Sequence, residues 1–195
     1  METMEMVDFT AKGVNFVYGK EFVVNTYGKE TWDELLASMP WESSKVWREE
    51  LHLSELYPFS AFKDLISSLC KIKNSDSCEE NAEMYAFIAE KSLNSIYKLF
   101  FKIANPAFVI RNYPKLWQRF FTEGTVEVPV SHSGYAMISF CVSDKFLDWL
   151  PSACYGYSKK AVEMAGGSGV RVKENFKSKM KDGTWSVFYE IFWED

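Results

Sequence analysis

Residues 116–130, LWQRFFTEGTVEVPV, contain the point at which the spacing of apolar residues changes. Before Gly124, large apolar residues such as Leu116 and Phe120 recur at intervals of three or four, which is typical of one face of a helix. After Gly124, valines alternate with Glu127 and a proline, which is typical of a strand with one buried face. The stretch therefore joins a helical half of the chain to a strand-rich half.

The sequence upstream of this stretch has a helical pattern. Thr31 and Glu34 have the spacing of a capping box, and Asn105 before Pro106 is typical of an N-cap followed by proline at the first helical position. Pro114 lies inside the next helical pattern, so we expect a kink or a break there. The expected helices cover residues 31–39, 43–51, 57–72, 79–104 and 105 to about 122.

The downstream sequence predicts four strands and one helix. Pro129 cannot donate a hydrogen bond to a neighbouring strand, so the first strand is expected at a sheet edge or at a bulge. The pair Asp182 and Gly183 is typical of a two-residue type I′ turn between the last two strands. The expected strands are 126–130, 136–142, one that begins at 170, and 184–193, and the expected helix is 152–165. The predicted fold class is α+β, a helical layer packed on a four-stranded, mainly antiparallel sheet, with one helix crossing between its hairpins.

The length and composition are those of one globular domain. The chain has 195 residues, of which 47% are hydrophobic, 17% aromatic and 25% charged, which excludes a disordered, collagen-like or coiled-coil chain. We expect a single domain over residues 1–195, with a helical part at about 20–123 and a sheet part with its crossing helix at about 124–195.

The charge balance argues against a nucleic-acid-binding protein. Lysines and arginines number 22 against 27 aspartates and glutamates, a net charge of −5, whereas phosphate binding needs a concentrated basic surface. One segment is locally basic: it contains Arg171, Lys173, Lys177, Lys179 and Lys181, opposed by Glu174. We expect a solvated face of two strands and their turn, and a patch for an anionic partner is the alternative.

The cysteines and the hydropathy pattern are typical of an intracellular chain without membrane spans. Cys70, Cys78, Cys141 and Cys154 lie far apart and form no C-x-x-C pair, so we expect reduced thiols. The first residues are acidic where a signal peptide is basic. Apolar stretches end before the roughly 20 residues that a membrane span needs. We therefore expect a cytoplasmic protein.

Patterns for catalysis and metal binding are weak. No pair of cysteines, histidines or carboxylates has the spacing of zinc ligands. The glycines in 166–169 follow a helix, whereas a phosphate loop precedes one, and in Ser131-His132-Ser133 neighbouring side chains point apart. Cys154 could lie in the first turn of its helix, where a thiol becomes reactive, but a small core thiol fits the sequence better. We expect no enzymatic activity, no metal and no cofactor.

Aromatic residues are concentrated around one predicted helix junction. Most belong to the core, and the surplus could line an apolar cavity or form a contact surface for a second subunit. Gly156 stands within a helix, where it permits the close approach of a second backbone, either in the same chain or across a subunit interface. The candidates for a ligand cavity or an interface are Tyr97, Phe101, Phe108, Tyr113, Trp117, Phe121, Cys154 and Gly156.

A series of motifs runs along nearly the whole chain. It comprises Lys12-Gly13 before Phe22-Val23, Gly28 with Trp32 and Leu36 before Pro40, Trp47, Tyr57-Pro58, Asn94-x-Ile96-Tyr97-x-Leu99-Phe100, Asn105-Pro106 with Phe108, Leu116-Trp117-x-x-Phe120-Phe121-x-x-Gly124, and Cys154-x-Gly156. These motifs resemble a family of uncharacterised bacterial proteins that is expanded in myxobacteria. That family, a domain of unknown function, is distantly similar to the vinyl-reductase-domain, TRAPP-subunit and haem-nitric-oxide-binding folds.

The resemblance implies a helical layer over an antiparallel sheet, frequent dimerisation and, in some members, a buried channel for an apolar ligand. It implies no shared chemistry, because a fold does not fix a function. Haem-binding members of the wider group use a proximal histidine and a Tyr-x-Ser-x-Arg motif. Here His52 and His132 are the only histidines, and the nearest match to the motif, YGYSK at 155–159, has the wrong spacing and no arginine. We therefore expect no haem.

The main hypothesis from the sequence is a non-catalytic module that acts through protein contacts, as a homodimer or an adaptor. The alternative is a sensor domain that binds a small apolar ligand between helices and sheet, which predicts a closed cavity lined by rings. An enzyme is the third hypothesis, and it needs a cleft in which Cys154 or His132 meets a carboxylate.

Overall fold

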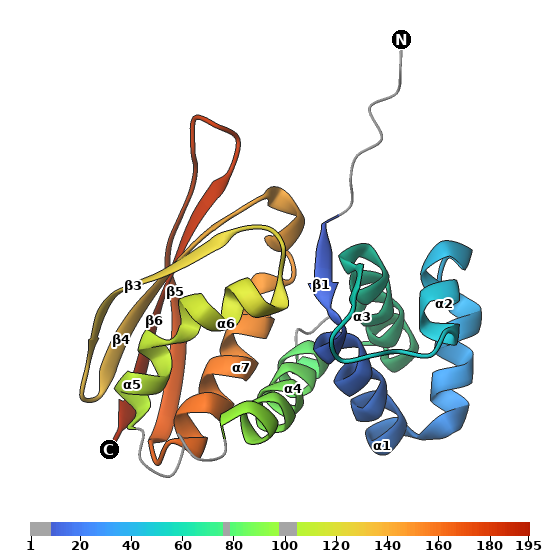
Figure 1. Cartoon of the computed structure of the whole chain (residues 1–195), viewed down its shortest axis with the longest axis horizontal. Helices are drawn as coiled ribbons and strands as arrows, with labels where there is room; N and C mark the ends of the chain where they lie inside the picture. Colours follow the sequence, from blue (N-terminus) through green and yellow to red (C-terminus); the bar gives the residue numbers. More distant parts are fainter. Residues whose placement is uncertain (1–8, 76–78, 98–104) are drawn as a thin grey trace.

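The computed structural model describes residues 9–75, 79–97 and 105–195. The elements follow one another as drawn in Figure 1. The helices are α1 (Gly13–Ser38), α2 (Trp41–Arg48), α3 (Phe59–Lys73), α4 (Glu79–Tyr97), α5 (Pro106–Arg111), α6 (Tyr113–Phe120) and α7 (Leu150–Met164), and Asp144–Phe146 forms a 3-10 turn. The strands are β1 (Thr10–Lys12), β2 (Leu56–Pro58), β3 (Thr125–His132), β4 (Tyr135–Val142), β5 (Ser168–Lys179) and β6 (Trp185–Glu194).

The large sheet has four antiparallel strands in the order β3-β4-β6-β5. Hairpins join β3 to β4 and β5 to β6, and α7 crosses between these hairpins, so the predicted α+β architecture is confirmed. Pro129 lies in the edge strand β3, where the register shifts between Glu127 and Val130. Both expectations for this proline, an edge and a bulge, are therefore met.

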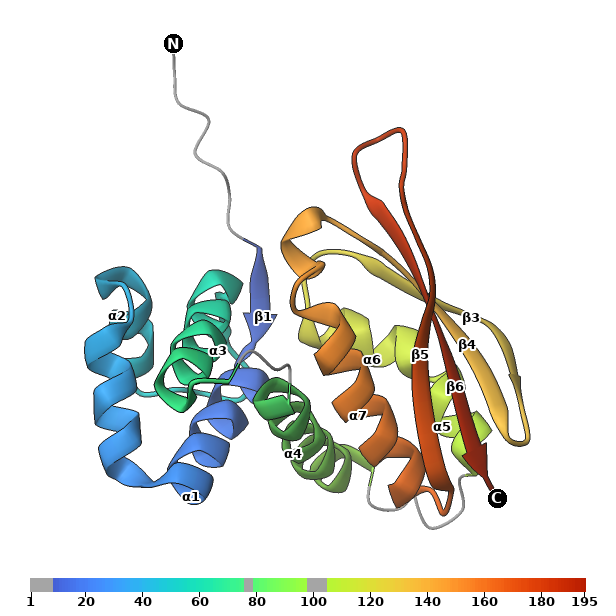
Figure 2. The same ribbon diagram turned by 180° about the vertical axis from the view of Figure 1, so that it is seen from behind.

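The sheet and its helices form one half of the molecule, and the N-terminal helices form the other (Figures 1 and 2). Helices α5 and α6 pack against β3, while α7 packs against β5 and lies along α4. Helix α4 also contacts α1, so it stands between the two halves. The face of the sheet that contributes Phe140 and Tyr189 to the core is thereby covered.

The first long helix begins much earlier than the sequence pattern predicts. Helix α1 starts at Gly13, and Gly28, with φ of 86° and ψ of 168°, separates it into two helical segments. The hydroxyl of Thr31 donates to the carbonyl of Tyr27 instead of capping a helix. The expected helix start at Thr31 is therefore wrong, because the turn at Gly28 already ends one helical segment and begins the next.

A short strand pair precedes α3 where the sequence predicted the start of that helix. Residues 56–58 pair with residues 10–12 as an antiparallel ribbon, and α3 begins at Phe59. A three-residue strand has no periodicity long enough to recognise, and Pro58 at its end resembles the first position of a helix. The predicted start of α7 is also shifted, in the other direction. This helix begins at Leu150 rather than at residue 152, and Pro151 lies in its first turn.

The turn between β5 and β6 is longer than the predicted two-residue turn. The amide of Gly183 donates to the carbonyl of Met180, so Asp182 occupies the third position of the turn and Gly183 the fourth. The carboxylate of Asp182 accepts hydrogen bonds from the amide and hydroxyl of Thr184. Gly183 has φ of 90°, so its conformational freedom is still required, at a different turn position.

Two predicted helix boundaries around the centre of the chain are confirmed. The side chain of Asn105 accepts a hydrogen bond from the amide of Phe108 at 2.8 Å, and Pro106 is the first residue of α5. A break at Asn112 separates α5 from α6, and Pro114 lies in the first turn of α6. The predicted continuation of the preceding helix to residue 104 lies outside the described residues.

The basic segment lies on the edge strand β5 and the turn that follows it. All five of its cationic side chains are exposed, and two stack on rings, Arg171 over Phe192 and Lys177 over Trp185. These contacts agree with a solvated strand face, and binding of an anionic partner stays a prediction.

Cys70, Cys141 and Cys154 form no disulfide within the described part of the chain, and Cys78 lies outside it. Among the described helices, none combines the length and hydropathy needed to cross a bilayer.

Candidate functional site: a ring-lined cavity

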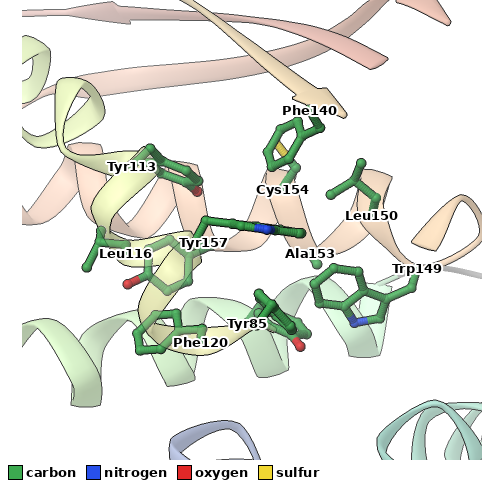
Figure 3. A pocket seen from close by; sticks show the side chains of 12 residues that line it. Tyr85, Tyr113, Leu116, Phe120, Phe140, Trp149, Leu150, Ala153, Cys154 and Tyr157 are labelled. Carbon is green, nitrogen blue, oxygen red and sulfur yellow. The ribbon is translucent and has the colours of Figure 1, made fainter. Parts of the chain in front are cut away.

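A cavity of about 40 Å³ lies where α4, α6 and α7 meet the sheet. Its wall consists of rings and aliphatic side chains, with one thiol (Figure 3). The residues that line it are Tyr85, Tyr113, Leu116, Trp117, Phe120, Phe121, Phe140, Trp149, Leu150, Ala153, Cys154 and Tyr157. They come from α4, α6 and the residue after it, β4, α7 and the turn before α7, so the cavity exists only in the folded chain.

Helix α6 supplies one side of the wall because its apolar residues recur at intervals of three and four. The ring of Trp117 lies 4.5 Å from that of Phe121 and meets the ring of Phe140 edge to face at 5.3 Å. Tyr157 from α7 meets Tyr113 edge to face at 5.6 Å. Such interlocked rings make a rigid wall, since each is held by its neighbours.

The polar atoms on the α7 side of the wall form hydrogen bonds with one another. The hydroxyls of Tyr113 and Ser158 form a hydrogen bond of 2.8 Å, and the Cys154 thiol lies 3.8 Å from the same serine oxygen. Burial raises the pKa of the Cys154 thiol to about 12 and the pKa of Tyr113 well above its usual value. Both groups are therefore neutral at physiological pH, and the thiol is not a nucleophile.

Two buried polar atoms on the α4 side form no hydrogen bond of regular geometry with a described residue, although they lie close enough to each other for the indole to offset part of the rise in the pKa of the phenol. They are the hydroxyl of Tyr85 and the indole nitrogen of Trp149, whose rings meet edge to face at 5.0 Å. Burial raises the pKa of Tyr85 well above its usual value. Next to them, Asn81 donates to the hydroxyl of Ser152 and to the carbonyl of Trp149, which ties α4 to the start of α7.

Gly156 fixes the distance between α7 and α4 rather than facing a solvent-exposed surface. A β-carbon at this position would stand 1.9 Å from the carbonyl oxygen of Ala82, which is closer than any real contact. Of the two interpretations that the sequence left open, the structure supports packing within the chain. The same close approach brings Tyr85 of α4 and Ala153 of α7 to the wall of one small space.

The candidate residues from the sequence separate into three groups. Tyr113, Trp117, Phe121 and Cys154 line the cavity, whereas Gly156 packs on α4 beside it. Phe108 does not line it: the side chain is 43% exposed on α5, because it lies on the face of that short helix that points away from the core. The side chain of Tyr97 and the whole of Phe101 lie outside the described residues.

Eight lining residues were not among the sequence candidates. They are Tyr85, Leu116, Phe120, Phe140, Trp149, Leu150, Ala153 and Tyr157. Periodicity places Phe120 on the helical face of Leu116, and Phe140 on the inward side of its strand. It does not show which of the many buried side chains in the chain stand around a space, because that depends on contacts between distant segments.

The described wall does not fit a haem. His52 and His132 are both exposed and neither lines the cavity, so no histidine reaches the position of an axial ligand. A cavity of about 40 Å³ is also far below the roughly 300–1,000 Å³ of pockets that hold cofactors. In the segment that partly matches the propionate motif, Tyr157 is part of the cavity wall, and Lys159 lies over the ring of Tyr155.

The other weak patterns also take structural roles. Ser131 donates to the carbonyl of Ala107, and the hydroxyl of Ser133 donates to the carboxylate of Asp195, so both hydroxyls beside His132 hold the end of the hairpin. Within the described ranges, no three cysteine, histidine or carboxylate side chains come together as they would around a metal ion.

Comparison with known proteins shows the fold and no closer relation. No protein-family model and no curated protein matches the chain. Among solved structures, a Cs H-NOX variant superposes with a TM-score of 0.73 at 14% identity, over 94% of this chain and 97% of that one. An oxygen-binding H-NOX domain related to soluble guanylate cyclases gives 0.69 at 13% identity, over 94% and 95%. The H-NOX protein from K. algicida gives 0.68 at 16% identity, over 94% and 97%. The chain therefore has the fold of the haem-nitric-oxide-binding domains.

Proposed function

We propose that this chain is a haem-free sensor domain that binds a small apolar molecule in the cavity between α4, α6, α7 and the sheet. The observation that carries the proposal is the cavity itself, a buried space in an otherwise closely packed region of rings. The fold gives support, because one of the similar structures is an oxygen-binding H-NOX domain. The sensor hypothesis therefore has more support than the adaptor hypothesis.

The volume limits the ligand to a few heavy atoms. A cavity of about 10–15 Å³ holds one water molecule, so about 40 Å³ accommodates a molecule of two or three heavy atoms. Larger ligands would require the rings of Trp117 and Phe120 to move. Gas-sized molecules fit without such a change.

The chemistry of the wall favours an uncharged and mostly apolar ligand. The hydroxyl of Tyr113 already bonds to Ser158, and most of the wall is carbon. On the α4 side, the hydroxyl of Tyr85 and the indole nitrogen of Trp149 can bond to one polar atom of the ligand, or to a water molecule that the ligand displaces. A charged ligand would find no counterion, because Cys154 and Tyr113 are both neutral.

Xenon is a suitable probe because it is apolar and of the right size. We expect the ¹²⁹Xe chemical shift to depend on protein concentration, and Ala153→Leu, which fills the cavity, to abolish this dependence. The matched control Ala165→Leu changes a residue at the C-terminal end of the same helix, outside the cavity wall. A xenon shift that is equal in the wild type and in a folded Ala153→Leu variant would overturn the proposal.

The adaptor and homodimer hypotheses remain proposals with less support. The sequence left open whether the face of α7 that carries Gly156 forms a subunit interface. In the structure, α4 of the same chain covers this face. Native mass spectrometry tests the oligomeric state directly, and a mass of two chains would support the homodimer hypothesis.

A further inference from the structure

The hairpin of β5 and β6 carries both cations and exposed apolar side chains on a projecting part of the molecule. Its turn extends past β3, β4 and the helices packed on the sheet (Figures 1 and 2). Phe176 is 54% exposed and Met180 48% exposed. We infer that this hairpin docks the protein on an anionic lipid surface, with Phe176 and Met180 entering the interface between the headgroups and the acyl chains.

The two apolar side chains lie on the same face of the hairpin. The register of β5 on β6 is regular after Phe176, and the amide of Met180 donates to the carbonyl of Thr184, so alternation places Met180 on the side of Phe176. This side is opposite the core, because Phe188, the partner of Phe176, is next to the buried Val187. The rings of Phe176 and Phe188 lie 6.0 Å apart, so they form one apolar projection.

The hairpin is basic although the chain as a whole is acidic. Residues 168–184 contain five lysines and arginines and two carboxylates, a net charge of +3, whereas the whole chain carries −5. Both carboxylates accept hydrogen bonds from within the hairpin, Glu174 from Tyr189 and Asp182 from Thr184. The charge of the hairpin is therefore complementary to an anionic surface.

The cations of the hairpin are available to such a surface. Two of the five lie over aromatic rings of β6 and keep their charge. The other three are exposed and form no ion pair with a residue that the structure describes: Lys173, Lys179 and Lys181. A two-stranded ribbon is thin, so cations on both of its faces lie within roughly 8 Å, one Debye length, of a surface on which it rests. Each of them then adds to the attraction to an anionic leaflet.

The projecting apolar groups favour a lipid surface over an acidic protein. Positive charge alone would suit either partner. Phe176 and Met180 stand out from a narrow hairpin, and a bilayer interface admits such groups without a preformed pocket, whereas a folded protein must provide a complementary one. The acidic remainder of the chain is repelled by the same leaflet, which orients the hairpin toward the lipid.

Co-sedimentation with vesicles tests the inference. The vesicles contain equal parts of phosphatidylcholine and phosphatidylserine, and vesicles of phosphatidylcholine alone serve for comparison. We expect binding to the mixed vesicles only, and weaker binding as the NaCl concentration rises. The variants Lys173→Gln/Lys179→Gln/Lys181→Gln and Phe176→Ser/Met180→Ser should each weaken this binding at least about tenfold.

Each variant has a matched control. Lys29→Gln/Lys45→Gln/Lys115→Gln removes the same charge from exposed positions outside the hairpin. Trp41→Ser/Phe108→Ser removes two exposed apolar side chains from α2 and α5. We expect both controls to bind the mixed vesicles like the wild type, and circular dichroism verifies that every variant is folded.

A protein that does not bind the mixed vesicles, or a folded hairpin variant that binds them as well as its control, would overturn the inference. Binding that requires the lysines but not Phe176 and Met180 would indicate attraction by charge alone and would reject insertion into lipid. The inference is independent of the cavity, because the xenon experiment involves no lipid and the vesicle experiment involves no cavity ligand. Either proposal can therefore fail while the other is supported.

Discussion

Single hydroxyl groups in the cavity wall differ in what they contribute to stability. Tyr113 and Ser158 satisfy each other, whereas the hydroxyl of Tyr85 has only a contact with the Trp149 indole that lacks regular hydrogen-bond geometry. A buried polar group without a hydrogen bond costs about 1–3 kcal/mol, and a satisfied one contributes about 1 kcal/mol. The same Tyr→Phe change should therefore have opposite effects at the two positions.

We expect Tyr85→Phe to leave the free energy of unfolding unchanged or to raise it by up to about 1 kcal/mol. Tyr113→Phe should lower it by about 1 kcal/mol, because Ser158 loses its hydrogen bond to the phenol and keeps only the weaker contact with the Cys154 thiol. Urea unfolding followed by circular dichroism measures both. An equal loss of stability in the two variants would show that Tyr85 has a partner.

At the scale of elements, the contact between α4 and α7 determines the shape of the site. Gly156 lets the backbones meet at Ala82, and the two helices then supply Tyr85, Ala153 and Tyr157 to one wall. A change in the distance between these helices alters the cavity without changing a lining residue.

We expect Gly156→Ala to lower the free energy of unfolding by about 1–3 kcal/mol, since its β-carbon would overlap the carbonyl of Ala82 and force the helices apart. Better helix propensity would offset at most about 1 kcal/mol of this loss. Thermal unfolding and ¹²⁹Xe shifts of the variant measure stability and cavity together. Tyr155→Ala, at the exposed neighbouring position, is the control; a Gly156→Ala variant as stable as this control would contradict the packing argument.

At the scale of the whole molecule, the fold is that of haem-nitric-oxide-binding domains, while the cavity wall does not suit a haem. The similar structures cover 94% of the chain, so the architecture is shared over nearly its full length. Neither of the two histidines lines the cavity. The shared fold therefore does not by itself imply haem binding, because the side chains decide what a fold can bind.

We expect the protein purified from cells supplied with 5-aminolaevulinate to show no Soret absorption, because no histidine reaches the cavity and the space is too small. An H-NOX domain prepared in the same way is the control. A Soret band at one haem per chain would contradict the prediction and would also exclude the haem-free form of the sensor proposal.

Much of the fold follows from the sequence alone, because the deciding signals are local. The change of periodicity after Gly124, the cap at Asn105 and the bulge at Pro129 depend on neighbours within a few residues, and the sequence predicts all three. Helix α1 before Gly28 was missed, because its burial against other helices, rather than a local signal, stabilises it.

The candidate site also has features that the sequence predicts and features that it does not. The sequence alone determined that rings are concentrated near α6, that Cys154 lies close to them and that histidines are scarce. Only the tertiary structure decided that Tyr85, Phe140 and Trp149 complete the cavity wall and that Phe108 stays outside it. The physical reason is that a cavity is a property of packing between segments distant in sequence, whereas periodicity and capping act within one segment.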